Sequence, residues 1–326
     1  MDSVTQAVED TIKQADKILV VTHVGPDGDA IGSLTAVGQI LLQMGKPATL
    51  MCDDNVPERF RYLLLADQVQ RPLDEKHQFD LLIAVDCGDE QRMGQSFAKL
   101  AGPAPVIINI DHHITNTKFG DINVIDTTAV STTEILYDLF ANAGITLDRD
   151  LAMSLLTGLV TDTLGFRTSS TSAKTLKIAS VLVDAGANLP MIAQQGLALK
   201  KKNTILLWRY GLENMRLEDG LAWTAITAVE REAAGFNGAS SNGLSNLLSD
   251  IEDVAIGAVL MEMGDGRIRV GFRSRPPYDV AQIAMNLGGG GHANAAGCML
   301  ENIPLDKAEA MVVSMCKEAI HQQDAM

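Results

Sequence analysis

Four short segments in the first half of the chain place aspartate and histidine side chains directly after apolar runs. The first run, KILVVTH at 17–23, is followed by GPDGDA, and the second, DLLIAVDCGD at 80–89, carries an aspartate at its polar end. A third run, PVIINIDHH at 105–113, ends in one aspartate and two histidines, and another aspartate lies late in the segment 148–163. These side chains are His23, Asp27, Asp29, Asp86, Asp111, His112, His113 and Asp162.

Together these residues predict a two-metal site for phosphoester hydrolysis. Any one segment alone could be a turn or a helix cap, but the carboxyl ends of parallel strands meet at one edge of a sheet. Carboxylates gathered there repel one another, and divalent cations relieve that repulsion. Mixed carboxylate and imidazole ligands suit Mn²⁺, with Mg²⁺, Co²⁺ or Zn²⁺ as alternatives. Two such ions about 3.5–4 Å apart generate hydroxide and clamp a phosphoryl group for in-line attack.

The segments that carry these residues predict an α/β domain. The apolar runs alternate with stretches of helical periodicity at 29–45, 131–144 and 148–163. The second of these begins with serine and threonine, has a glutamate three residues after its first serine and ends at a glycine, which are helix-capping signals. Strands that alternate with helices predict a mostly parallel sheet flanked by helices on both faces.

Length and composition predict a globular protein of two domains. The chain has 326 residues, of which 46% are hydrophobic and 21% charged. At ~150 residues per domain this length suggests about two domains. We expect a catalytic metal-binding domain at 1–186, a helical connector at 187–215 and a smaller α/β substrate-binding domain at 216–326. We interpret residues 196–218 as a helical connector rather than a flexible linker, since they contain no Pro/Gly/Ser-rich stretch.

Charge and cysteine usage exclude several other classes of protein. A net charge of −15 argues against binding long duplex nucleic acid, and an aromatic content of 4% argues against a base-stacking platform. The four cysteines form no C-x-x-C pair, which argues against a zinc ribbon and fits a reducing compartment. The N-terminus does not read as a signal peptide, and no apolar run reaches the ~20 residues of a membrane span. We therefore expect a cytoplasmic protein with no membrane partner.

Two segments of the second half are suited to binding an anionic ligand. RVGFRSR at 269–275 offers the guanidinium of Arg273 and the hydroxyl of Ser274, both good phosphate ligands. In NLGGGGHANAAGCML at 286–300, a glycine-rich turn would let backbone amides approach an anion closely. We expect His292 to follow this turn at a helix start. The glycines expected to bind substrate are Gly289, Gly290 and Gly291.

In their order, the motifs VTHVGPDGDAIGS, AVDCGD, DHH and TGLVTDT resemble those of the DHH phosphoesterase superfamily. The two segments of the second half resemble the DHH-associated C-terminal domain. The resemblance implies two sets of metal ligands bridged by Asp86, namely His23 with Asp27, and Asp29 with His112 and Asp162. It also implies that Asp111 orients ligands and that His113 faces the substrate phosphate.

Within that superfamily, size and domain pairing are most similar to the oligoribonuclease group that also hydrolyses 3′-phosphoadenosine 5′-phosphate (pAp). This implies hydrolysis of very short RNA to mononucleotides, and of pAp to AMP, by a hydroxide that two metal ions activate. The ions would be Mn²⁺ first, with Mg²⁺ or Co²⁺ as alternatives. The second domain would hold the nucleotide part of the substrate. The oligomeric state stays open, with a homodimer as one option.

Other functions also stay open. They are a phosphodiesterase for linear or cyclic dinucleotides, a RecJ-like exonuclease, a pyrophosphatase or polyphosphatase, and a non-enzymatic nucleotide sensor. RecJ-type enzymes usually carry additional domains, for which we find no segment. Family II pyrophosphatases carry a Ser-Arg-Lys-Lys-type motif, whereas the nearest basic run here is Lys200–Lys202. A sensor has no need for a bridging Asp86. The acidic net charge favours ligands of only a few nucleotides.

Overall fold

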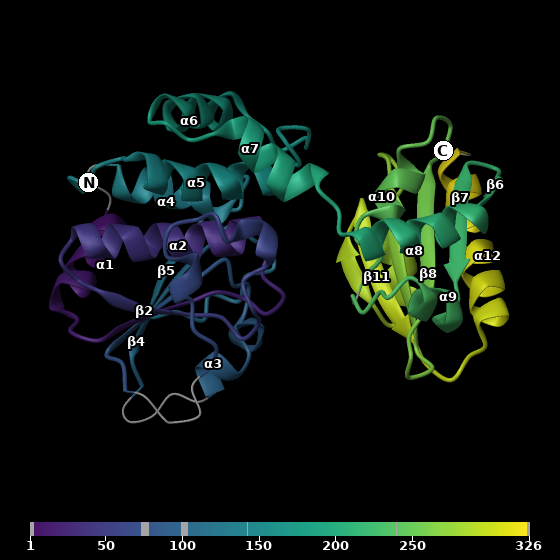
Figure 1. Ribbon diagram of the computed structural model, residues 1–326, viewed down its shortest axis with the longest axis horizontal. Coiled ribbons are helices and arrows are strands. Elements are labelled where there is room, and N and C mark those ends of the chain that lie inside the picture. Colours follow the sequence, from purple (N-terminus) through teal and green to yellow (C-terminus); the bar gives the residue numbers. More distant parts are fainter. Residues whose placement is uncertain (1–2, 73–77, 99–103, 142, 239, 325–326) are drawn as a thin grey trace. The chain divides into compact units, whose positions relative to one another are not determined.

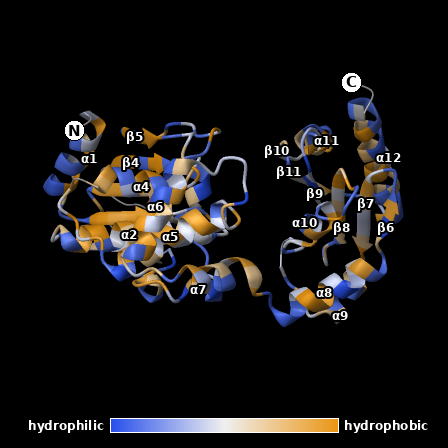
Figure 2. Cartoon of the chain, turned by 90° about the horizontal axis from the view of Figure 1, so that it is seen from above, coloured by the Kyte–Doolittle hydropathy of each residue, from blue (hydrophilic) through white to orange (hydrophobic). Residues whose placement is uncertain are grey.

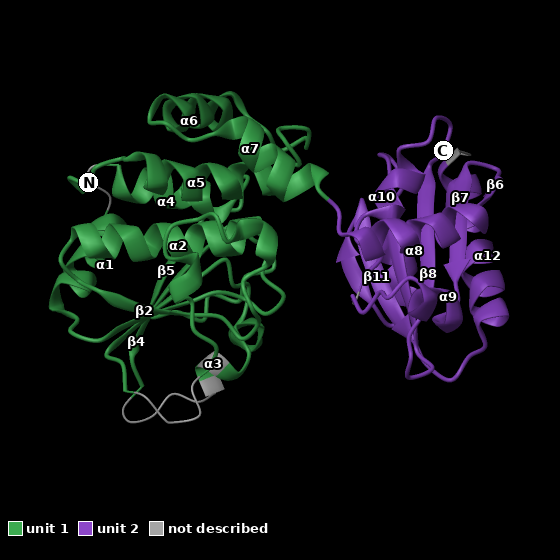
Figure 3. Ribbon diagram, in the orientation of Figure 1, with its two compact units in different colours: residues 1–199 green, residues 200–326 purple. Residues whose placement is uncertain are grey.

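The computed structural model divides the chain into two compact units, residues 1–199 and 200–326 (Figures 1 and 3). The boundary falls inside the connector predicted at 187–215. Each unit has its own sheet and its own hydrophobic core, so each is described by itself. The described residues are 3–72, 78–98, 104–141, 143–238 and 240–324.

The first unit is built on a parallel sheet of five strands in the order β2-β1-β3-β4-β5. The strands are β1 (Ile18–Val21), β2 (Ala48–Met51), β3 (Leu81–Val85), β4 (Val106–Asp111) and β5 (Ile122–Ile125). Strands β1 and β3 are buried at every position, as expected for continuous apolar runs in a sheet covered on both faces. The chain leaves β1 toward β2 on one side and returns to β3 on the other, so the strand order reverses between β1 and β3.

Most helices of the first unit contribute to the larger core on one face of this sheet. They are α1 (Ser3–Gln14), α2 (Gly28–Gln43), α4 (Thr132–Phe140), α5 (Arg149–Asp162), α6 (Ala173–Asp184) and α7 (Leu189–Ala193). Figure 2 shows α2 as largely hydrophobic, in keeping with its almost complete burial. A smaller cluster with Met93 and Phe97, from the short helical segments Glu90–Met93 and α3 (Gln95–Ala98), covers the other face. The predicted α/β class and the three predicted helices are confirmed.

The second unit has a mixed sheet of six strands in the order β10-β11-β9-β8-β7-β6. Its strands are β6 (Arg216–Glu218), β7 (Leu221–Ile226), β8 (Ile256–Glu262), β9 (Ile268–Ser274), β10 (Gly290–His292) and β11 (Ala295–Leu300). Its helices are α8 (Lys202–Glu213), α9 (Ala228–Ala233), α10 (Leu244–Ser249), α11 (Val280–Asn286) and α12 (Leu305–Asp324). One core joins the sheet to α11 and α12, and a second core joins β7 and β8 to α8 and α10.

One local prediction is wrong, and another holds only in part. The segment 196–218, expected to be a helical connector, contains α8, but Leu199–Lys201 are not helical and 216–218 pair with β7 as a strand. The amide of Leu199 donates to the carbonyl of Gln194, which ends a π-helical turn before α8 begins. His292 does not begin a helix, because Gly290–His292 pair with β11 as an edge strand.

None of the described helices is by itself long and apolar enough to cross a membrane. Among the described residues, α6 and the segment Leu189–Ala198 are long and apolar enough when taken together, but the chain bends sharply between them.

Candidate metal centre

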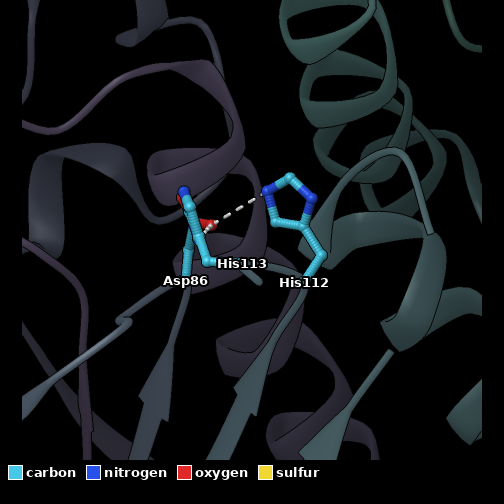
Figure 4. Close-up of side chains that lie close together, drawn as sticks. All are labelled: Asp86, His112 and His113. Atoms are coloured by element: carbon cyan, nitrogen blue, oxygen red, sulfur yellow. Dashed lines mark ion pairs between the residues drawn. The ribbon is translucent and has the colours of Figure 1, made fainter. Parts of the chain in front are cut away.

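The strand ends of the first sheet position half of the predicted ligands. His23 follows β1, Asp86 follows β3, and His112 and His113 follow β4. Because β1 and β3 flank the point where strand order reverses, their carboxyl ends lie at the position where open parallel sheets generally bind ligands. Figure 4 shows Asp86, His112 and His113, which come from the ends of β3 and β4.

Two helices bring in the remaining carboxylates. Asp27 caps α2 by accepting hydrogen bonds from the amides of Asp29 and Ala30, and Asp29 lies in the first turn of the same helix. Asp162 is the last residue of α5. The two helices pack closely because Gly158 has no side chain, since a Cβ at this position would overlap Oδ1 of Asp29.

The ligand atoms form three overlapping groups, in each of which all atoms lie within 4.8 Å of one another. The groups are His23 with Asp27 and Asp86, Asp29 with His112 and Asp162, and Asp86 with His112 and His113. Nε2 of His23 is 3.4 Å from Oδ2 of Asp86, and Nε2 of His112 is 3.7 Å from Oδ1 of the same carboxylate. Asp86 thus lies between the two sets of residues that the sequence motifs suggested as ligands.

His112 provides a test of whether this cluster suits a metal ion. Its Nε2 is buried and makes no hydrogen bond to any described residue, although carboxylate oxygens of Asp29, Asp86 and Asp162 lie 3.2–4.0 Å away. Burial lowers the pKa of His112, but the contact with Asp162 and the charges of these carboxylates outweigh burial and raise it to about 10. A buried imidazole nitrogen facing several carboxylate oxygens is a donor set that divalent transition metals accept.

The pKa values of the two buried carboxylates Asp29 and Asp86 are shifted in opposite directions. Burial raises the pKa of Asp29 well above its usual value, and the charges of Asp86 and Asp162 raise it further. Burial would also raise the pKa of Asp86, but the hydrogen bond and charge of His23, with the two histidines after β4, lower it to about 2. Asp86 therefore stays ionised in its buried position, as a carboxylate shared by two cations must.

Threonines at the start of α4 hold two of the carboxylates in place. Oγ1 of Thr132 donates to Oδ1 of Asp86 at 3.0 Å, and Oγ1 of Thr133 donates to Oδ1 of Asp29 at 2.9 Å. The sequence pattern of this STTE segment indicates only a helix start. Its contacts with the cluster arise from the packing of α4 on α2, which capping signals do not encode.

A second hydrogen-bond chain orients His113. Oδ1 of Asp111 lies 2.7 Å from Nδ1 of His113, and Nδ2 of Asn116 donates to Oδ2 of Asp111 at 2.6 Å. This contact with Asp111 raises the pKa of His113, while burial opposes it. The His113 side chain is 33% exposed and Asp111 is fully buried, so an anchored imidazole faces outward. Asn116 was not among the predicted site residues.

In the second unit, Arg273 and Gly290 line a hollow of about 260 Å³ on the face of β9, β11 and β10. Gly289 and Gly291 allow the backbone to pack closely against β11, because a Cβ on either would overlap a carbonyl oxygen of that strand. His292 is exposed at the end of β10.

Ser274 does not join this face. Its side chain points to the opposite side of β9, as alternation along a strand requires, and is 9% exposed. Its hydroxyl donates to the carbonyl of Tyr278 at 2.7 Å, with the carbonyl of Ala293 at 3.1 Å. The prediction that Ser274 binds substrate is therefore wrong.

Comparison with known proteins agrees with the motifs in both units. Residues 17–159 match the model of the DHH family N-terminal domain, and residues 224–322 match the DHHA1 domain. The chain is 31% identical to the bifunctional oligoribonuclease and PAP phosphatase NrnA of Thermus thermophilus, over 93% of the chain and 90% of that protein. It is 25% identical to the cyclic-di-AMP phosphodiesterase GdpP of Geobacillus thermodenitrificans, over 98% of the chain but 49% of that protein.

A solved structure shares the whole fold. The crystal structure of an exopolyphosphatase-related protein from Bacteroides fragilis superposes with a TM-score of 0.87 at 23% identity, over 99% of this chain and 96% of that one. The family matches define the chain as a phosphoester hydrolase, and the cluster of histidines and aspartates at the sheet edge is suited to divalent metal ions. The chain belongs to the DHH family of phosphoesterases, with a DHHA1 domain as its second unit.

Proposed function

We propose that this phosphoesterase hydrolyses short RNA oligonucleotides to mononucleotides and pAp to AMP and phosphate. The observation that carries the proposal is the continuous set of three ligand groups, which are joined to one another through Asp86 and His112 and include His113. The Thermus thermophilus relative, whose name includes both activities, supports this choice of substrates. The four buried free cysteines are consistent with a cytoplasmic location.

The proposed metal site holds two divalent cations, Mn²⁺ first and Mg²⁺ or Co²⁺ as alternatives. The cations would supply a hydroxide nucleophile at neutral pH and offset the charge of the phosphoryl group. Asp86 would contact both cations. The other ligands would be His23 and Asp27 in one set, and Asp29, His112 and Asp162 in the other.

Each remaining residue has a distinct role. His113, whose ring Asp111 anchors, would donate a hydrogen bond to a phosphoryl oxygen of the substrate. In the second unit, Arg273 and the amide backbone near Gly290 would bind the phosphate of a terminal nucleotide, and His292 would contact the nucleotide from the same sheet face. The metal-binding unit performs the chemistry, and the second unit selects the substrate.

A length series tests the proposal. The expected result is that RNAs of two to five nucleotides have a far higher kcat/KM than a 24-mer, because the hollow beside Arg273 has a volume of only about 260 Å³. Equal or higher rates on the 24-mer would indicate a processive exonuclease instead. The GdpP relative makes a cyclic dinucleotide the second candidate substrate, so cyclic di-AMP belongs in the same series.

A further inference from the structure

On the face of the second sheet that carries Arg273, three rows of residues run across β9 and β11. Cross-strand partners point to the same side of a sheet, so the pairing defines each row. Arg273 pairs with Ala295, which in turn pairs with His292 on β10. The next row is Gly271, Gly297 and Gly290, and the third pairs Arg269 with Met299.

The middle row forms a floor without side chains. A Cβ placed on Gly271 or Gly290 would meet no atom within 4 Å, so the space above these two glycines is open. Both glycines line the 260 Å³ hollow, together with Arg269 on one side and Arg273 on the other. Four residues along a strand span about 14 Å between Cα atoms, so the two arginines stand at opposite ends of the floor.

Neither arginine has an anionic partner among the residues that the structure describes. Within the described part of the chain, neither forms an ion pair, whereas Arg267 pairs with Asp265 at 2.6 Å and Arg216 pairs with Glu309 at 3.1 Å. The guanidinium of Arg273 donates to the carbonyl of Phe272, which keeps it at its own end of the floor. Two separated, uncompensated guanidiniums in a chain of net charge −15 favour a ligand with two anionic groups.

A polar loop also lines the hollow, and a hydrogen bond holds its backbone in place. Ser240 and Ser241 line it, and the carbonyl of Ser241 accepts a hydrogen bond from Nε1 of Trp208 at 2.9 Å. No aromatic side chain is among the residues that line the hollow in the described structure. This composition suits phosphate and ribose groups and offers no ring on which a base would stack.

We infer that Arg269 binds a second backbone phosphate of the oligonucleotide, one that pAp does not possess. The inference rests on the proposed function. Of the two phosphates of pAp, one is hydrolysed at the metal centre and the other is bound by Arg273. Arg269 therefore has a ligand only when the substrate is at least a 5′-phosphorylated trinucleotide. Arg269 would therefore favour oligonucleotides of three or more nucleotides over pAp.

The test compares a 5′-phosphorylated tetraribonucleotide with pAp at constant ionic strength. In Arg269→Ala, the ratio of kcat/KM for the tetranucleotide to that for pAp should fall about tenfold, the effect of one charge-assisted hydrogen bond. Arg267→Ala is the matched control, because it removes the same charge from an exposed arginine that is paired with Asp265 and does not line the hollow. It should leave the ratio unchanged.

Neutral methylphosphonate substitutions at each non-scissile phosphate identify the contact. At one position, the substitution should lower kcat/KM of the wild type about tenfold. The same substitution should hardly lower kcat/KM of Arg269→Ala, which already lacks the contact. Additive losses at every position would overturn the inference, as would a kcat/KM ratio within twofold of the wild-type value. If the wild type hydrolyses neither RNA nor pAp, the proposed function fails, and the inference fails with it. If the wild type hydrolyses both, a negative result overturns the inference alone.

Discussion

Nε2 of His23 lies 3.4 Å from Oδ2 of Asp86, which joins the carboxyl ends of two neighbouring parallel strands. Both side chains are buried, at 5% and 2% exposure. Asp86 also has a positive φ of 59°, an uncommon conformation for a residue other than glycine. A buried carboxylate held in this conformation, with histidines from two strands beside it, is the centre around which the proposed site is organised.

Replacing Asp86 with asparagine should abolish hydrolysis of every substrate while the fold is kept. The amide retains the shape of the side chain but removes the charge that two cations would share. Turnover should fall by several orders of magnitude at saturating Mn²⁺ with an unchanged circular dichroism spectrum. Asp67→Asn, at an exposed aspartate beside Arg61, serves as the control and should keep wild-type rates. Activity of Asp86→Asn within tenfold of wild type would remove Asp86 from the centre.

The hydrogen bond from Asn116 to Asp111 leads to a second prediction. Asn116→Ala should lower kcat about ten- to hundredfold, the usual cost of losing a residue that positions a site ligand, with a smaller effect on KM. Steady-state kinetics with pAp measures both quantities. Asn123→Ala is the control, since that side chain bonds the backbone of Gly120. A change in KM alone would assign Asn116 to substrate binding instead.

Binding of Mn²⁺ should strengthen as pH rises. The pKa of His112 is raised to about 10 in the metal-free protein, so its ring carries an extra proton at pH 7, which an imidazole must lose before it can bind a metal. Each proton displaced makes the apparent affinity rise by up to about tenfold per pH unit below that pKa. Titration calorimetry at pH 6.5 and 8, in buffers of different ionisation enthalpy, measures proton release. Binding without proton release and with equal affinity at both pH values would contradict this assignment.

Arg273→Ala should separate substrate selection from chemistry. One lost charge-assisted hydrogen bond at a phosphate costs ~1.5–3 kcal/mol, or roughly ten- to 150-fold in kcat/KM for pAp. A generic ester such as bis-p-nitrophenyl phosphate has no nucleotide to place in the hollow, so the ratio of the two kcat/KM values should fall by that factor. Asp29→Ala should damage both substrates alike, since it removes a ligand. Equal losses on both substrates in Arg273→Ala would assign Arg273 to the reacting centre or to the fold.

Much of the fold and of the cluster could be predicted from the sequence, because the decisive signals are local. Continuous apolar runs predict buried parallel strands, and parallel strands bring the residues that follow them to one edge. His23, Asp86 and His112 converge for this reason alone. The capping signal at Ser131 likewise locates the start of α4, whereas the helix ends at Phe140, before the predicted stop at Gly144.

What could not be predicted depends on how segments distant in sequence pack together. Thr132 and Asn116 act through contacts with Asp86 and Asp111, which no local pattern records. The prediction that Ser274 binds substrate is wrong because the type of a residue does not indicate which face of a strand its side chain occupies. Arg269 was overlooked because its relation to Arg273 depends on the all-glycine row between them, which only strand pairing reveals.

The measurement that tests the central claim most directly is a panel of kcat/KM values for the purified protein with Mn²⁺. The substrates are pAp, a 5′-phosphorylated ribodinucleotide, a 24-mer RNA, a cyclic dinucleotide and pyrophosphate. We predict that pAp and the dinucleotide are hydrolysed with the highest kcat/KM, to AMP with phosphate and to mononucleotides respectively, and that chelation of the metal abolishes both activities. A preference for pyrophosphate or the cyclic dinucleotide, or full activity after chelation, would contradict the account.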